Sequence, residues 1–71
     1  MSQYSDVIEK TERVLSNASV LLYAANDRIY QDDPKKALII LNEVKTRVTL
    51  ALLNVDNIIA TLEETRALPA T

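Results

Sequence analysis

The stretch "YQDDPKK", residues 30–36, divides the chain and determines its fold. Asp33 can cap a helix N-terminus, and Pro34 can take the first helical position, where its missing N–H group costs nothing. The residue before Pro69 is biased out of the helical region. A helix is therefore predicted over about 34–67.

The residues before this stretch predict another long helix, over about 4–30, with Ser2 or Ser5 as its cap. The connection at 31–33 is so short that the two helices must lie antiparallel. The remaining residues, 68–71, are expected to form a tail. The sequence thus predicts an all-α fold, a single two-helix antiparallel hairpin of 71 residues.

Both predicted helices carry apolar residues at steps of three and four, the pattern of a helix with one face in a core. In the first helix this stripe is Tyr4, Val7, Thr11, Val14, Ala18, Leu21 and Ala25, widened by Ile8, Leu15, Leu22 and Ile29. In the second it is Ala37, Leu41, Val44, Val48, Ala51, Val55, Ile58 and Leu62, flanked by Leu38, Leu52 and Ile59. Both stripes are expected to form the seam within the hairpin.

Several function classes are disfavoured by composition. The chain has no glycine, which disfavours phosphate-cradling loops and nucleophile elbows, and neither histidine nor cysteine, the usual transition-metal ligands. Histidine is also the commonest general base near neutral pH. The sequence therefore predicts no catalytic residues, no metal site, no cofactor and no enzymatic activity.

The charge pattern argues against nucleic acid and membrane as partners. The net charge is −2, and Lys35 and Lys36 fall at the loop while Lys10 and Arg13 fall near the other end, so no continuous basic stripe forms. The uncharged segments are too short to cross a bilayer. The beginning "MSQYSDVIEK" is polar, so no signal peptide is expected, and the cytoplasm is the predicted location.

Some large apolar residues fall outside the two stripes, and we interpret them as a second seam that one hairpin cannot close. The candidate dimer or partner interface consists of Val20, Tyr23, Tyr30, Ile39, Ile40, Leu50, Leu53 and Asn54. Within "TLALLNV", residues 49–55, this assigns Leu52 and Val55 to the hairpin seam and Leu50 and Leu53 to the second seam. Asn54 adjoins both stripes and is a candidate for a polar residue that fixes register.

In length, topology and excess apolar surface, the chain resembles several groups of small helical proteins. These are the two-helix co-chaperones that guard a needle subunit in type III secretion and the small phage or bacterial inhibitors that dimerise as helical hairpins. The plasmid copy-number RNA-binding hairpin is also similar in length and topology. The resemblance is one of architecture without a shared motif, so no functional residue is carried across.

The sequence therefore predicts a protein-protein interaction module that self-associates, as a homodimeric four-helix bundle, and that binds, inhibits or chaperones a second protein. Two alternatives stay open. One is a purely structural assembly subunit, and the other is an RNA-binding dimer of helical hairpins.

Overall fold

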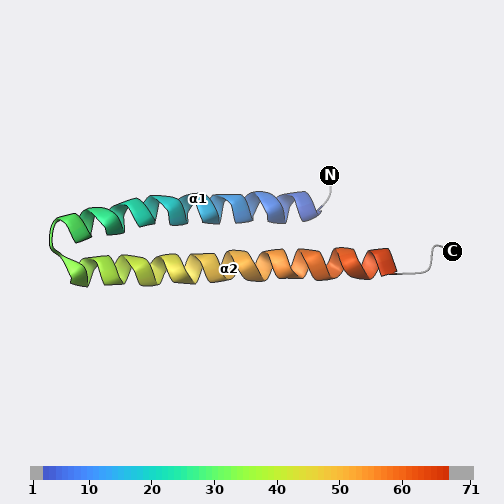
Figure 1. The fold of residues 1–71 in the computed structure, drawn as a ribbon. Coiled ribbons are helices and arrows are strands. Elements are labelled where there is room, and N and C mark those ends of the chain that lie inside the picture. Colours follow the sequence, from blue (N-terminus) through green and yellow to red (C-terminus); the bar gives the residue numbers. More distant parts are fainter. Residues whose placement is uncertain (1–2, 68–71) are drawn as a thin grey trace.

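The computed structural model describes residues 3–67 and contains two α-helices packed side by side. Helix α1 spans Gln3–Tyr30 and helix α2 spans Pro34–Ala67, and they run antiparallel (Figure 1). There is no strand among the described residues, so the predicted all-α hairpin is confirmed. Ser5 lies inside α1, which makes the prediction of Ser5 as the cap wrong. Ser2 and the predicted tail lie outside the described residues.

The turn between the helices ends α1 with a residue in the left-handed region, where glycine is the usual choice. Asp32 takes this position with φ 58°. The N–H of Asp32 donates to the carbonyl of Ile29 at 3.0 Å, and the N–H of Asp33 donates to the carbonyl of Arg28 at 2.8 Å. Aspartate is among the residues that tolerate this conformation, so a chain without glycine still makes a tight helix ending.

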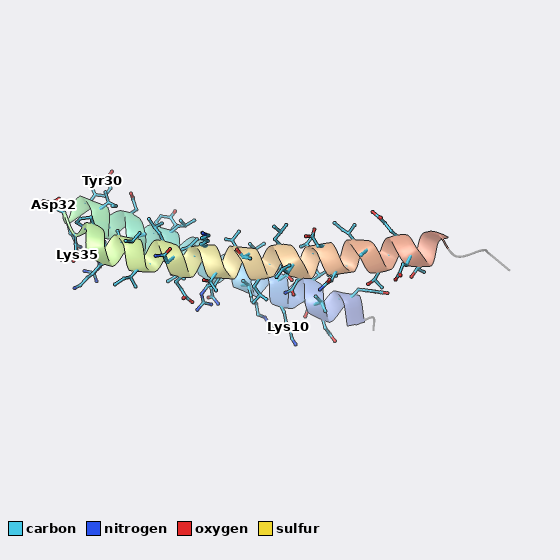
Figure 2. All side chains as sticks on the ribbon, turned by 90° about the horizontal axis from the view of Figure 1, so that it is seen from below. Lys10, Tyr30, Asp32 and Lys35 are labelled. Carbon is cyan, nitrogen blue, oxygen red and sulfur yellow. The ribbon has the colours of Figure 1, made fainter. Side chains whose placement is uncertain are left out.

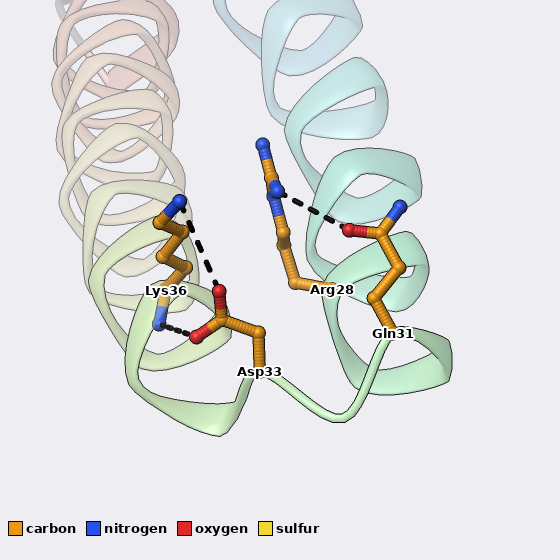
Figure 3. Close-up of polar contacts among 4 residues, drawn as sticks. All are labelled: Arg28, Gln31, Asp33 and Lys36. Atoms are coloured by element: carbon orange, nitrogen blue, oxygen red, sulfur yellow. Dashed lines mark hydrogen bonds and ion pairs between the residues drawn. The ribbon is translucent and has the colours of Figure 1, made fainter.

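The start of α2 is capped as the sequence predicts. Oδ1 of Asp33 accepts a hydrogen bond from the backbone N–H of Lys36 at 3.3 Å, and Pro34 occupies the first helical position (Figure 3). The Lys36 ammonium also lies 3.9 Å from Oδ2 of Asp33. On the α1 side of the turn, the Arg28 guanidinium donates to the Gln31 side-chain oxygen at 3.2 Å. The Asp33 side chain therefore satisfies one backbone donor of the first turn that would otherwise be unpaired.

The seam between the helices is built from small residues at steps of seven. In α1 the buried positions are Thr11, Ala18 and Ala25, and in α2 they are Ala37, Val44 and Ala51. Alanine lets two helices approach closely, because no long side chain holds their backbones apart. Among the described residues no large side chain is fully buried. The buried line of the seam thus contains little apolar volume, and it is flanked by half-buried Val7, Val14, Leu21 and Ile58.

The molecule is a single layer of helices, long and thin. Its principal extents are 62 × 20 × 12 Å, and 12 Å is about the diameter of one helix with its side chains. Viewed from below, α1 passes behind α2 and emerges on its other side, so the two helices cross at a shallow angle (Figure 2). Domains usually bury their apolar faces between two packed layers, and this chain supplies one.

Candidate interaction surface

One broad side of the hairpin is lined by large aliphatic side chains from both helices, which we call the apolar face. Its members are between 40% and 61% exposed. They are Ile8, Leu15, Leu22 and Ile29 on α1, and Leu38, Leu41, Val48, Leu52, Val55, Ile59 and Leu62 on α2. The α1 row repeats at intervals of seven residues, as does the α2 row Leu41, Val48, Val55 and Leu62. This repeat is the a/d spacing of helices in bundles.

This surface corrects the sequence prediction that assigned these residues to the hairpin seam. Leu52 and Val55 are 58% and 40% exposed, so they lie at the edge of the seam and not within it. The physical reason is that two helices meet along one narrow line. The buried alanines occupy that line, and the larger side chains beside them are pushed to its rim.

The two helices contribute jointly to the apolar face near the middle of the hairpin. An open groove of about 240 Å³ is lined by Leu15 from α1 and by Val48, Ala51, Leu52 and Val55 from α2. Every lining residue has an aliphatic side chain. The groove therefore offers a hydrophobic side chain a place to insert, and it contains no group that could perform chemistry.

The opposite edge of the seam mixes apolar and polar side chains, since Ile40 and Asn54 each follow a buried alanine by three residues, and it contains a contact of Thr11, the one buried polar residue among those described. The Thr11 hydroxyl donates to the carbonyl of Val7 at 2.8 Å and accepts from Nδ2 of Asn54 at 3.4 Å. This contact joins α1 to α2 across the seam. Asn54 therefore lies at the hairpin seam, three residues after Ala51, whereas the groove residues Leu52 and Val55 lie on the other side of that alanine.

Most residues of the predicted second seam lie on the outer sides of the helices, away from the seam. Exposed fractions are 66% for Val20, 74% for Tyr23, 83% for Tyr30, 69% for Ile39, 50% for Leu50 and 55% for Leu53. Ile40 and Asn54 are half-buried.

Helical geometry separates these residues into different surfaces. Val20, Ile39 and Leu53 each follow a buried alanine by two residues, which is about 200° around a helix. Their side chains therefore point outward from two helices that face one another. The structure does not bring the α1 members and the α2 members of the predicted second seam together on one surface.

Few charged contacts are found on the described part of the chain. Besides the pair at the turn, Nε of Arg47 donates to Oε1 of Glu43 at 3.1 Å, one helical turn apart. Lys10 and Lys35 are well separated along the molecule (Figure 2). Exposed ion pairs of this kind contribute little to stability.

Residues 3–67 contain neither a metal-binding cluster nor a membrane-spanning segment. The described residues contain no group of three or more candidate metal ligands. None of the helices within that range has both the length and the apolar character needed to cross a bilayer. No protein-family model, no curated protein and no solved structure was found to match this sequence.

The sequence carried a signal that could have identified the apolar face. Both helices alternate a small residue with a large aliphatic residue, as in Leu15 and Ala18 on α1 or Val48 and Ala51 on α2. When a helix offers both sizes on neighbouring rows, the small row allows the closest approach of a second helix. The large row is then left at the rim, where it requires a further layer to cover it.

Proposed function

We propose that this protein is a non-enzymatic protein-protein interaction module that self-associates through its apolar face and then binds a second protein, as an inhibitor, adaptor or chaperone does. One observation carries the proposal. Eleven large aliphatic side chains stay about half exposed on one side of a single helical layer, while the buried seam consists of alanines, one valine and one threonine.

The energetics favour covering this surface. Fully burying a large aliphatic side chain is worth about 1.5 to 3 kcal/mol. Burying the exposed half of each of eleven such side chains would then contribute up to about 8 to 16 kcal/mol per chain. A whole small domain is stable by only about 5 to 15 kcal/mol. Association is therefore expected to decide whether the hairpin is folded.

The outer sides of the helices are proposed to bind the second protein. Tyr23 and Tyr30 are seven residues apart on α1 and are the most exposed aromatic side chains of the described residues. Tyrosine provides an apolar ring and a polar hydroxyl, which makes it common at protein interfaces. Val20 lies beside them on α1, and Ile39 and Leu53 occupy the outer side of α2. A sequence without cysteine is compatible with the reducing cytoplasm, the proposed site of action.

Self-association is tested by thermal unfolding, followed by circular dichroism over a hundredfold range of protein concentration. Because association is coupled to folding, the midpoint temperature is expected to rise with concentration. A cooperative transition at the same temperature throughout would show that the hairpin folds alone, and self-association would be rejected.

The second-protein interaction is tested with Tyr23→Asp in an affinity purification from the host cell. The variant is expected to lose the partner that the wild-type chain retains, while its helical content and its oligomeric mass stay unchanged. Ser16→Asp is the matched control, because Ser16 lies seven residues earlier on the same side of α1. Retention of the same partner by Tyr23→Asp would place the binding surface elsewhere.

A further inference from the structure

The two edges of the apolar face differ in polarity, and this difference bears on what covers the face. Between residues 38 and 59 the α2 edge is formed by Leu38, Leu52 and Ile59, with Lys45 as the one charged member of that stretch. The corresponding α1 edge is formed by Glu12, Ser19 and Asn26. The members of each edge lie three or four residues from members of the aliphatic row beside it. The apolar face is thus hydrophobic up to the outer edge on α2 and polar at the outer edge on α1.

The area and the repeat of the apolar face suit a second copy of the chain. The two-helix part of the body is roughly 40 Å long, from the 28 residues of α1, and 20 Å wide, so one broad side is comparable to the roughly 800 Å² that each partner contributes to a standard interface. Heptad rows on both helices match the spacing of side chains in antiparallel four-helix bundles. A two-fold dimer would also cover the same face on both chains at once.

A second copy can cover the face in two symmetric ways. If both loops lie at the same end, α1 of each chain packs on α2 of the other. If the loops lie at opposite ends, α1 packs on α1 and α2 packs on α2. Neighbouring helices are antiparallel in both arrangements, so helix direction does not distinguish them.

The polarity of the edges does distinguish them. With the loops at the same end, the apolar α2 edge would lie against the polar α1 edge, and leucine side chains would meet Glu12 and Asn26. With the loops at opposite ends, apolar edge meets apolar edge and polar edge meets polar edge. The second arrangement buries more apolar area and leaves the polar groups hydrated. The aliphatic stem of Lys45 can lie along its neighbours while its ammonium reaches water.

We propose that the apolar face is covered by a second copy of this chain with its loop at the opposite end, α2 packing on α2 and α1 on α1. This rests on the proposed function and specifies its first partner.

The proposed register places the two-fold axis of the dimer at the groove. Leu15 lines one groove with Val48 and Val55, so the two aliphatic rows lie side by side in this part of the hairpin, and the proposed two-fold axis is placed at the level of Val48. A two-fold axis at this level places Val48 beside Val48 of the second copy and Leu41 beside its Val55. On α1 it brings Leu15 near Leu15 of the second copy. Each aliphatic row then packs on the same row of the second copy, because its members are spaced by seven residues on either side of the axis.

Engineered cysteines test this register, since the natural chain has none. Val48→Cys is expected to form a disulfide-linked dimer rapidly under mild oxidation, because the two thiols would face each other across the axis. Thr49→Cys is the matched control: it is the next residue along and lies on the outer side of α2. Equal rates for the two variants would overturn the proposed register.

The relative direction of the two hairpins is tested separately with a spin label on Lys35→Cys, a substitution outside the face. Thirteen residues separate Lys35 from Val48, so labels on two copies with opposite loops should lie roughly 40 Å apart. Loops at the same end would bring the labels within roughly 25 Å.

The possible outcomes separate this inference from the proposed function. A dimer with the short label distance overturns the arrangement and leaves self-association standing. A folded monomer rejects both. A rapid Val48→Cys crosslink together with the long distance supports both.

Discussion

Leu52 and Leu53 are adjacent leucines, and we expect association of two chains to bury Leu52 and to leave Leu53 exposed. Both are on α2 and are 58% and 55% exposed in the hairpin. Leu52 belongs to the apolar face and lines its groove, whereas Leu53 points outward. Replacing each in turn with glutamine keeps helix propensity nearly constant and removes the aliphatic side chain. The pair thus isolates the effect of position from that of residue type.

The size of the effect follows from the area that association would cover. Burying the remaining 58% of Leu52 is worth about 1 to 1.5 kcal/mol per chain, and a symmetric dimer contains two copies. Leu52→Gln is therefore expected to weaken dimerisation by about 2 to 3 kcal/mol, or roughly 30- to 150-fold in Kd. Leu53→Gln should change Kd by less than about threefold, in line with typical surface substitutions of within about 0.5 kcal/mol.

The assay is sedimentation equilibrium of both variants and the wild-type chain in the same buffer, with circular dichroism at each concentration to measure helical content. If Leu53→Gln weakens association as much as or more than Leu52→Gln does, the outer side of α2 is the self-association surface. That result would refute the assignment of the apolar face and would favour the second seam expected from the sequence.

Four further substitutions test the hairpin itself by urea unfolding. Ala51→Leu should destabilise the fold by about 1 to 3 kcal/mol, because the buried seam has no room for a larger side chain; unchanged stability would mean that the helices do not approach closely there. Asp33→Ala should cost about 0.5 to 2 kcal/mol through loss of the cap. Lys36→Ala, which keeps the cap and removes only the exposed ion pair, should cost less than about 0.5 kcal/mol, and equal losses would assign the effect to the ion pair. Asp32→Gly should raise stability by up to about 1 kcal/mol by relieving the left-handed residue, and a loss of stability would contradict that account.

The helices and the turn could be predicted from the sequence because their signals are local. Asp33 and Pro34 mark the start of α2 by capping chemistry, and the cap is confirmed by the hydrogen bond to Lys36. The α1 stripe through Thr11, Ala18 and Ala25 is likewise the buried one. Each of these features depends on a few neighbouring residues and needs no knowledge of the other helix.

The division of apolar residues between the seam and the exposed face could not be predicted in the same way. Leu15 and Ala18 lie on adjoining rows of one helix, and hydrophobicity alone favours burying the leucine. Which row is buried depends on how closely two backbones approach, and that distance is a property of the pair of helices. The same applies to Asn54, whose contact with Thr11 joins residues 43 positions apart in sequence.

The residues that the sequence assigned to a second seam illustrate a related limit. Tyr23 and Leu53 share the property of lying outside the main stripes, but residues outside a stripe can point in more than one direction. Only the packing of α1 on α2 shows that these two side chains point outward from different helices. The proposal of a second partner at Tyr23 consequently concerns the outer side of α1 separately from the outer side of α2.

The central claim is that a second layer of helices, supplied by another copy, covers the apolar face when the chain is folded. The most direct measurement is the mass of the wild-type protein by sedimentation equilibrium under conditions where circular dichroism shows it to be helical. A mass of twice the 7.9 kDa chain is predicted. A helical species with the mass of one chain at every concentration would contradict the claim.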